Sequence, residues 1–420
     1  MHCPFHVLIA RSRRNCSCYK KVSPCSEIVP LSWRSCCKGQ SDAGEGNVNA
    51  TEIYQQTTRH FLRPILELLD DDSVTEVLIN GHETVFIERA GKLTQADDVR
   101  FPNASSLLAA ARNVAEYAGR PLDESRRSVD ARLPDGSRVH ILLPPASRCG
   151  ICVSIRKFSP QTLSLPRLIE LDSVTEEAAE FLSLAVAAHR NLLVSGGTGS
   201  GKTSLLNALS AEIATDERIV VIEDSSELQL SQPHTLYLEA QPPKPDGTPA
   251  MTIRDLFVES LRMRPDRIVV GEIRRGEALD LVQAMLSGHS GSMATIHAST
   301  PRDAAARLET LSLMSGVDIP VHVARSQVAS ALQIIVQVNR LADGRRQISA
   351  ISECRGMAEQ GGYHFEDIYR LTTQSGDSVR NQTPARLTPT GCIPHAAESI
   401  ALAGLLEKVN LTEALFAEFL

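Results

Sequence analysis

The sequence lacks any long uninterrupted apolar run, although 42% of its 420 residues are hydrophobic. A helix that crosses a membrane needs about 20 consecutive apolar residues, so the sequence predicts no membrane-spanning segment. The 22% of charged residues is typical of a globular protein. A chain of this length exceeds what one ordinary hydrophobic core supports, and we therefore expect two packed domains.

Charge of one sign is not in large excess either. The chain has 43 Lys and Arg residues against 50 Asp and Glu residues, for a formal net charge of −7 at pH 7. Proteins whose main partner is nucleic acid usually carry a strong basic excess or a basic face. We expect no direct nucleic-acid partner, and a local basic patch stays open as an alternative.

Cysteine is scarce beyond the start of the chain. The first 37 residues lack the paired CxxC or CxxC/His spacing of a zinc site, and they lack helical or strand periodicity. Their short apolar stretch, residues 5–10, does not make a signal peptide. We interpret residues 1–48 as a disordered, basic extension, either dispensable or the product of an early start codon. Six of the ten cysteines lie there: Cys3, Cys16, Cys18, Cys25, Cys36 and Cys37.

Cys149 and Cys152 do form a CxxC pair. The segment around them, residues 149–158, is expected to be a strand, in which side chains alternate between two faces. The two thiols would then point to opposite faces, so we interpret them as buried or incidental thiols.

The domain organisation follows from where periodic structure begins and ends. Residues 49–158 predict a smaller α+β domain. It contains two hairpin signals, with turns at Asn80-Gly81 and at 134–136, and a helix whose N-cap candidate is Asn103. Residues 159–175 are rich in Pro and Ser, and we interpret them as a linker that permits rigid-body motion.

Residues 176–420 predict an α/β domain. A helix over 176–189 leads into an apolar strand at 191–196, and strands and helices alternate from there to about Asn339. Such alternation is typical of a mostly parallel sheet covered by helices. The remainder of the chain is expected to be a helical C-terminal part, and no internal repeat is present.

The strongest chemical signal is GGTGSGKT, residues 196–203, which satisfies the full GxxxxGK[ST] pattern between a strand and a helix. Its glycines let backbone N–H groups face inward as a cradle for phosphates, before the positive N-terminus of a helix. Lys202 is expected to reach the β and γ phosphates of ATP, and the Thr203 hydroxyl to ligate Mg²⁺. The alternative is a glycine-rich turn that only caps a helix. The predicted nucleotide-binding residues are Gly196, Gly197, Thr198, Gly199, Ser200, Gly201, Lys202, Thr203 and Ser204.

Carboxylates follow two apolar strands further along the chain. Glu223 and Asp224 end the strand RIVVIED, and Glu272 follows the strand in RIVVGE. Doubly wound sheets gather their active groups at the carboxyl ends of strands. Carboxylates there can hold Mg²⁺ or orient the water that attacks the γ phosphate. The alternative is that they are ordinary charges at strand ends.

Histidines and arginines supply further candidates. His289 and His297 lie in a Gly/Ser/Thr-rich stretch and are candidates to contact the γ phosphate, with structural histidines as the alternative. Phosphoryl transfer also needs positive charge on its transition state. The arginine candidates are Arg132, Arg138 and Arg156 in the small domain and Arg254, Arg262, Arg264 and Arg274 in the larger one, and solvated surface arginines are the alternative.

Together these segments resemble the secretion-superfamily ATPases that drive type II secretion, type IV pili and type IV secretion. The resemblance covers residues 60 to 420, and four family blocks occur in order: GGTGSGKT, RIVVIEDSSEL, RIVVGEIR and GHSGSMATIHAS. It implies a RecA-like P-loop NTPase domain preceded by a smaller α+β N-terminal domain. By resemblance, Glu223 and Glu272 are the catalytic and metal-handling carboxylates. The better phosphate sensor is His297, and the family's arginines carry over onto Arg132, Arg138 and Arg156.

Within that superfamily, DARLPDGSRVHILLPP, SIRKF and TIHASTPRDAAARLETL are most similar to the CpaF/TadA branch, which assembles Flp pili. The resemblance implies a homo-hexamer that is cytoplasmic, peripheral at the inner membrane, and bound to the platform proteins of a pilus or secretion machine. One alternative is a conjugative or type IV secretion ATPase that moves DNA or effector protein. Another is a regulatory nucleotide-binding module without turnover.

Overall fold

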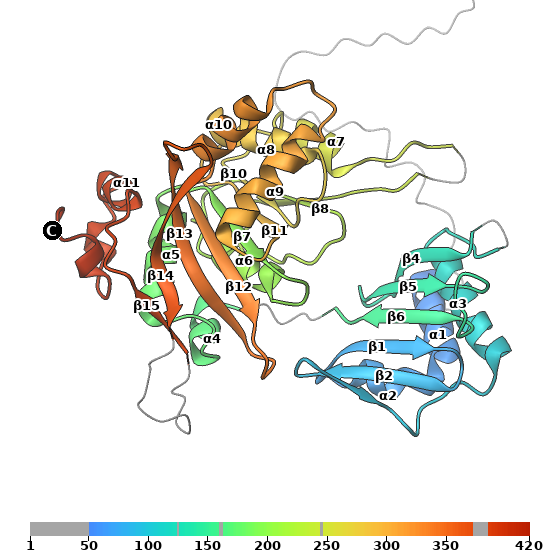
Figure 1. Cartoon of the computed structure of the whole chain (residues 1–420). Coiled ribbons are helices and arrows are strands. Elements are labelled where there is room, and N and C mark those ends of the chain that lie inside the picture. Colours follow the sequence, from blue (N-terminus) through green and yellow to red (C-terminus); the bar gives the residue numbers. More distant parts are fainter. Residues whose placement is uncertain (1–49, 124–125, 159–162, 244–246, 373–384) are drawn as a thin grey trace, which may run out of the picture. The chain divides into compact units, whose positions relative to one another are not determined.

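Two separate β-sheets organise the residues that the computed structural model describes, which are 50–123, 126–158, 163–243, 247–372 and 385–420 (Figure 1). Side chains are described from residue 53 onward. Residues Ala50–Leu420 form one compact unit that contains both sheets. The extension predicted at residues 1–48 lies outside the described residues.

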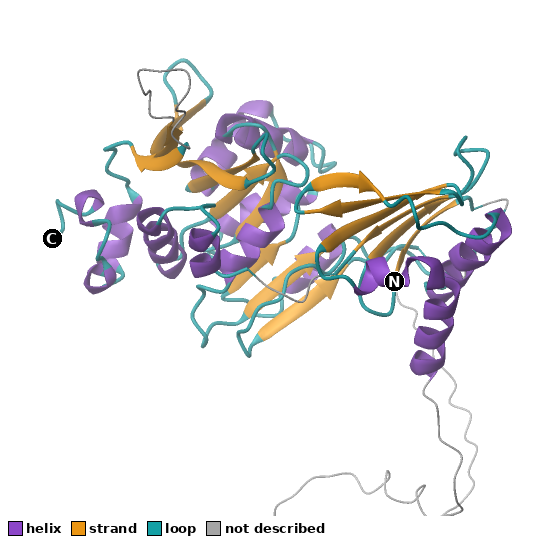
Figure 2. Ribbon diagram, turned by 90° about the horizontal axis from the view of Figure 1, so that it is seen from below, coloured by secondary structure: helices purple, strands orange, loops and turns teal. Residues whose placement is uncertain are grey.

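The first sheet has six strands in the order β3-β2-β1-β6-β5-β4, and all neighbouring pairs are antiparallel. Helices cover one of its faces (Figure 2). Their apolar side chains and those of the strands form a single core. The elements are α1 Ala50–Phe61, η2 Arg63–Ile65, α2 Leu66–Asp70, β1 Val74–Asn80, β2 Thr84–Arg89, β3 Lys92–Gln95, α3 Ala104–Tyr117, β4 Ser128–Arg132, β5 Arg138–Leu142 and β6 Cys152–Arg156.

Local signals in the sequence are confirmed in this part of the chain. The side chain of Asn103 accepts a hydrogen bond from the backbone N–H of Ser106, as an N-cap residue does at the start of a helix. Strands β1 and β2 pair from Asn80 and Thr84 outward, so the first predicted hairpin is present. Gly136 adopts a φ of 89° in the second hairpin turn, a conformation that favours glycine.

The CxxC segment differs from the strand predicted over residues 149–158. Strand β6 begins only at Cys152, and Cys149 is an exposed, free thiol in the preceding loop. Because Cys149 lies in a loop and Cys152 in a strand, the alternation of side chains along a strand does not apply to the pair. The carbonyl group of Cys149 instead lies close to Gly81.

The second sheet has nine strands in the order β15-β14-β13-β12-β7-β11-β10-β8-β9. The six strands from β12 to β9 in that order are parallel, and β13, β14 and β15 extend the β12 edge in antiparallel fashion. The strands are β7 Leu192–Gly196, β8 Ile219–Glu223, β9 Thr235–Glu239, β10 Arg267–Val270, β11 Met293–His297, β12 Ile334–Arg340, β13 Arg346–Met357, β14 Tyr363–Thr372 and β15 Arg386–Pro389.

Two apolar cores lie on opposite faces of this sheet. One contains α4, α5, α6 and α11, and the other contains α7, α8, α9 and α10. Strands β7 and β8 are buried along their whole length because helices cover both of their faces. The helices are α4 Leu165–Glu170, α5 Glu176–Ala187, α6 Lys202–Ser210, α7 Ile253–Ser260, α8 Glu277–Leu286, α9 Pro301–Leu313, α10 Val321–Ala331 and α11 Ala396–Leu402, followed by η3 Leu406–Lys408 and η4 Glu413–Leu415.

This order of strands confirms the predicted fold class. The phosphate-loop strand β7 lies between β11 and β12, so one strand separates it from β10, which leads to Glu272. That order, in an α/β sheet with helices on both faces, is the arrangement of a RecA-like P-loop domain. The smaller α+β sheet precedes it in the chain.

Two segments differ from what the sequence led us to expect. The C-terminal part was predicted to be helical, but strands β13, β14 and β15 occupy 346–357, 363–372 and 386–389 before α11 begins. Within the predicted linker, helix α4 packs Leu165 and Leu168 into the core of the second sheet. The described part of that segment is therefore ordered by apolar burial.

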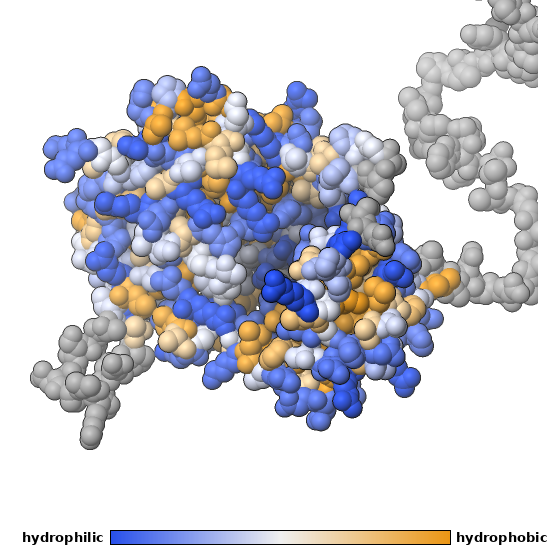
Figure 3. Space-filling view, turned by 45° about the vertical axis from the view of Figure 1, so that its right-hand side comes forward, coloured by the Kyte–Doolittle hydropathy of each residue, from blue (hydrophilic) through white to orange (hydrophobic). Residues whose placement is uncertain are grey.

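None of the helices within the described ranges is long and apolar enough to cross a membrane. The face drawn in Figure 3 is a mosaic of hydrophilic and hydrophobic side chains.

Candidate functional site

The phosphate loop joins β7 to α6 in a conformation that depends on glycine. Gly199 and Gly201 have φ values of 68° and 94°, in the region that other residues rarely adopt. A Cβ on Gly196 would lie 2.4 Å from the carbonyl oxygen of Val338, so a side chain there would displace β12. The sequence pattern thus produces a strand, a tight loop and a helix N-terminus in that order.

Lys202 is the first residue of α6, and its amino group points back into the loop. Its Nζ donates to the carbonyl oxygen of Gly197 at 3.0 Å and lies 3.2 Å from Nδ1 of His297. The side chain is buried, and burial lowers the pKa of the amine while the charge of Glu272 opposes that shift. Because none of its hydrogen-bond partners in the described structure is anionic, the ammonium group is available to bind phosphate.

Glu272 lies just beyond β10 and faces the loop. Its Oε2 accepts hydrogen bonds from Arg274, which also pairs with Asp224. Its Oε1 lies 2.6 Å from Nε2 of His297 without hydrogen-bond geometry, and this buried oxygen has no hydrogen-bond partner among the described residues. One carboxylate oxygen is thus fixed by an arginine, while the other faces His297.

Glu223 ends β8 and is buried. Its Oε1 accepts hydrogen bonds from the backbone N–H groups of Glu227 and Leu228 at 2.9 and 3.1 Å. A Cβ on Gly271 would lie 2.9 Å from Cγ of Glu223, so glycine makes room for this carboxylate. Burial raises the pKa of Glu223 to about 7, although the two hydrogen bonds oppose that shift.

The titration of Glu223 has a consequence for stability. Its pKa is higher in the folded chain than the ordinary value of 4.5, so the folded state binds more protons between these values and loses stability as pH rises. Glu223→Gln keeps the accepting oxygen and removes the charge. We expect it to raise the free energy of unfolding by on the order of 1–3 kcal/mol at pH 8, with the difference vanishing near pH 4.

Urea unfolding of the full chain and the variant at several pH values measures this difference. The matched control is Glu259→Gln, which changes an exposed carboxylate on α7. A stabilisation by Glu223→Gln that does not depend on pH would contradict the raised pKa.

The two histidines in the predicted phosphate-sensing stretch lie at opposite ends of β11. His297 ends the strand at the site, where burial, followed by the charge of Lys202, lowers its pKa, so that it is neutral near pH 7. His289 precedes the strand, in the loop that contacts Asn191 before β7. His289 does not line the cavity at the phosphate loop, because the five-residue strand β11 separates it from that loop by roughly 15 Å.

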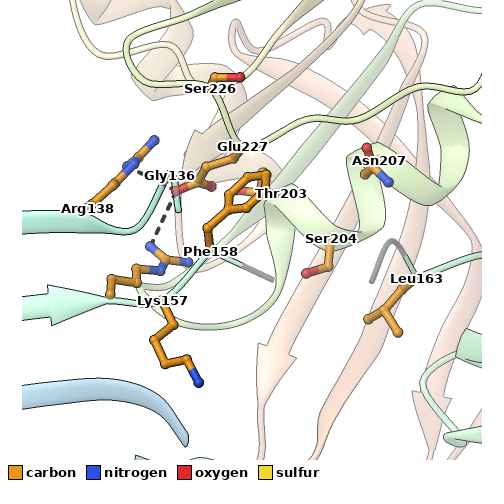
Figure 4. A pocket seen from close by; sticks show the side chains of 11 residues that line it. Gly136, Arg138, Lys157, Phe158, Leu163, Thr203, Ser204, Asn207, Ser226 and Glu227 are labelled. Atoms are coloured by element: carbon orange, nitrogen blue, oxygen red, sulfur yellow. Dashed lines mark ion pairs between the residues drawn. The ribbon is translucent and has the colours of Figure 1, made fainter. Parts of the chain in front are cut away.

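The three arginines predicted in the small domain form one row across the first sheet. Arg132 is paired in register with Arg138, and Arg138 with Arg156. Arg138 lies 3.0 Å and Arg156 3.6 Å from Oε1 of Glu227, as the dashed lines in Figure 4 mark. This carboxylate, three residues beyond Asp224, was not singled out in the sequence.

Arg132 contacts a different part of the second sheet. It donates to the hydroxyl of Ser225 and pairs with Glu239 at 2.8 Å. Of the three arginines, Arg138 and Arg156 line the cavity at the phosphate loop, and Arg132 lies beside it. Arg254, Arg262 and Arg264 do not line that cavity.

The cavity at the loop has a volume of about 210 Å³ and a polar lining. Of the predicted residues it brings together Thr198, Gly199, Gly201, Lys202, Thr203, Ser204, Glu223, Asp224, Glu272, His297, Arg138, Arg156 and Arg274, and it adds Ser225, Glu227, Gly271 and Thr295. A second cavity of about 320 Å³ shares Thr203, Ser204, Arg138, Arg156 and Glu227 with the first.

The second cavity differs from the first in its apolar side chains. Phe158 and Leu163 line it together with Asn207 (Figure 4). The ring of Phe158 packs over Gly136, where a Cβ would lie 3.3 Å from the ring. A flat group beside the phosphate loop could therefore contact an aromatic face here. No local signal in the sequence indicates this cavity, because its residues come from the first sheet, from α6 and from loops far apart in the chain.

The donor set fits Mg²⁺ as the sequence predicted. Magnesium usually keeps several waters and binds through one or two carboxylates together with phosphate oxygens. The Thr203 hydroxyl lines the cavity with Glu223 and Glu272, and Oε1 of Glu272 is the orphaned buried oxygen described above. Over the described ranges, no cluster of three or more His, Cys, Asp or Glu residues suits a metal. A Mg²⁺ ion here therefore relies on the nucleotide for part of its ligands.

The fold and the loop define a P-loop nucleotide-binding protein. The chain belongs to the type II/IV secretion system protein family, whose model matches residues 59–398.

Two curated proteins show the range of similarity. A putative conjugal transfer protein of Mycobacterium tuberculosis is 38% identical over 299 residues, which cover 69% of this chain and 84% of that protein. The type IV secretion system protein VirB11 of Bartonella quintana is 32% identical, covering 69% of this chain and 91% of its own. Among solved structures, the VirB11 ATPase of Brucella suis with sulphate is 31% identical, covers 72% of this chain and 96% of its own, and has a TM-score of 0.39.

Proposed function

We propose that this protein is an ATP-hydrolysing motor of a type II/IV secretion machine. The observation that carries the proposal is the placement of Lys202 and Glu272 on either side of His297, at the carboxyl ends of neighbouring parallel strands. A cation for the phosphates and a carboxylate for the attacking water are the two groups that phosphoryl transfer to water requires. Both face one cavity.

The roles follow from the contacts. Lys202 binds the β and γ phosphates from within the loop, and Arg274 holds Glu272 so that its Oε1, beside His297, is placed to orient water. Thr203, Glu223 and Glu272 would hold Mg²⁺, which would supply positive charge to the phosphates. His297, which contacts both Lys202 and Glu272, is placed to respond to loss of the γ phosphate.

The second cavity suits the base of the nucleotide. It continues from Thr203 and Ser204 away from Glu272, and it offers the aromatic side chain of Phe158 beside the amide of Asn207. Aromatic faces bind flat rings by stacking, and an amide can hydrogen-bond a ring nitrogen or amino group. We place the adenine of ATP there.

The arginine row is proposed to bind phosphate when the two sheets close on the nucleotide. Arg138 is half-buried, and its Nε, which is buried, has no hydrogen-bond partner among the described residues. We expect Arg138→Ala to weaken ATP binding about tenfold, the size expected for one hydrogen bond to a charged group. The matched control is Arg112→Ala on the exposed side of α3, and equal affinities of the two variants would contradict the role.

The wider setting is proposed from the family. We propose a homo-hexamer on the cytoplasmic face of the inner membrane, bound to the platform proteins of its machine. The blocks quoted above favour Flp pilus assembly, whereas the names of the relatives from Mycobacterium tuberculosis and Rhizobium radiobacter, conjugal transfer proteins, favour conjugation. Deleting the gene in its source organism separates these branches, because one predicts loss of pili and the other loss of DNA or effector transfer.

The motor proposal is tested by phosphate release from the full chain over a range of protein concentrations, with assembly followed by sedimentation. Turnover that rises as rings form supports a motor with sites shared between subunits. Tight ATP binding without turnover in assembled rings would replace the motor with a regulatory nucleotide-binding module.

A further inference from the structure

Two arginines flank the turn between β12 and β13 and do not line the cavity at the phosphate loop. Arg340 ends β12, Arg346 begins β13, and the two are paired in register across the hairpin. The turn between them closes on itself through Gly344, whose φ is 91°. The two arginines therefore project from a rigid hairpin end.

Arg346 contacts the phosphate loop from outside. Its Nε donates to the carbonyl oxygen of Gly199 at 3.0 Å. A Cβ on Gly201 would lie 3.1 Å from Cδ of Arg346, so the side chain passes directly over the glycine that begins α6. A loop that turns its N–H groups inward to phosphate must turn carbonyl groups outward, and Arg346 holds one of them.

Arg340 contacts the first sheet. Its Nη2 donates to the carbonyl oxygen of Gly91 and lies 3.4 Å from Oε1 of Glu88, which is itself mostly buried. Its Nη1 lies 3.6 Å from where a Cβ on Gly199 would be. One guanidinium thus lies between the turn after β2 and the phosphate loop.

The partner of Arg340 in the first sheet, Glu88, is connected to the arginine row through neighbouring strands. Glu88 is paired in register with Glu76, and Glu76 with Arg156, which is followed by Arg138 on β5. Coupling between distant sites is carried by contiguous hydrogen-bond networks and rigid secondary structure, and these strands form such a network. A displacement of the turn after β2 is therefore transmitted to the arginines proposed to bind phosphate.

We propose that Arg346 and Arg340 are positioning residues that couple the phosphate loop to the first sheet. Arg346 fixes the loop in its phosphate-binding conformation. Arg340 connects the loop to the turn at residues 88–92. Binding of phosphate in the loop therefore orders that turn and the arginine row. The inference rests on the proposed nucleotide site, and it concerns coupling rather than turnover.

Two measurements on the full chain test the coupling. The first is the affinity for MgATP and MgADP, in which Arg346→Ala is expected to weaken binding about tenfold. The second is amide hydrogen exchange at residues 84–95, which MgATP is expected to slow in the wild type. That slowing is expected to vanish in Arg340→Ala and in Glu88→Gln, which breaks the same ion pair from the other side.

The control is Arg345→Ala, because Arg345 carries the same charge in the same turn, and Asp343 is the one residue of the described ranges with which it forms an ion pair. It should change neither measurement. A purely structural role for Arg340 would lower thermal stability yet leave the effect of MgATP on exchange intact, and that result would overturn the proposal. So would unchanged affinity in Arg346→Ala.

These readouts also separate this inference from the motor proposal. If the chain binds MgATP without hydrolysing it, the motor proposal fails. The affinity and hydrogen-exchange measurements still test the coupling between the phosphate loop and the first sheet. Glu88→Gln keeps the test open if Arg340→Ala fails to fold, because it leaves the hairpin unchanged.

Discussion

Lys202→Ala is expected to lower ATP turnover by roughly 100- to 1,000-fold and to weaken ATP binding as well. A single charged donor aimed at developing negative charge contributes about this much to catalysis in a site shielded from water. The ammonium of Lys202 is buried, and its contacts in the described structure are a carbonyl oxygen and a neutral histidine. Its removal therefore leaves the loop without its cation. Steady-state phosphate release and equilibrium nucleotide binding measure the two effects.

The matched control for this experiment is Lys408→Ala, which removes an exposed lysine in η3. Lys202→Arg refines the result, because it keeps the charge but places a larger planar group where Nζ meets the carbonyl of Gly197. Full turnover in Lys202→Ala would contradict the assignment of the site, whatever the behaviour of the arginine variant.

The sequence predicted those features that depend on local chemistry. The phosphate loop could be located because its glycines occupy backbone conformations that other residues avoid. Asn103 could be recognised because an N-cap needs only a side-chain oxygen three residues before a free N–H group. In both cases the partners are neighbours in the chain, so spacing alone carries the information.

The sequence could not predict contacts that depend on how distant segments meet. Arg138 and Glu227 are 89 positions apart, and their pairing requires the first sheet to lie against the loop after β8. The cavity beside Phe158 and the contacts of Arg340 arise in the same way. Arg138 was a candidate from the sequence, but its partner Glu227 and the arginine Arg340 were not.

The C-terminal strands were missed for a different reason. Strand β13 contains Glu353, a buried carboxylate that accepts hydrogen bonds from the backbone N–H groups of His395 and Ala396 at the start of α11. A buried charge interrupts the apolar alternation by which a strand is recognised. The two histidines show that closeness in the sequence does not fix closeness in space, since β11 places His289 and His297 at its opposite ends.

Glu272→Gln is expected to leave ATP binding intact and to lower turnover by roughly 100- to 1,000-fold. General base action by a positioned carboxylate contributes about 10²- to 10⁴-fold, and the glutamine keeps the shape of the side chain while losing its basicity. Binding should survive because Lys202 and the backbone of the loop hold the phosphates from the other side of His297. Single-turnover phosphate release, set against nucleotide affinity, separates the two quantities.

Asp224→Asn tests whether Glu272 acts as the base or only positions Arg274, because Asp224 pairs with the same arginine. Asp224 pairs with Arg274, as Glu272 does, but it is half exposed and the described structure shows no contact between it and His297. If Glu272 acts as the base, Asp224→Asn lowers turnover only severalfold, because Arg274 still holds Glu272 through two nitrogens. If both variants lose turnover equally, the essential feature is the position of Arg274. Normal hydrolysis by Glu272→Gln would exclude this carboxylate from catalysis and leave Glu223 as the remaining buried carboxylate in the cavity.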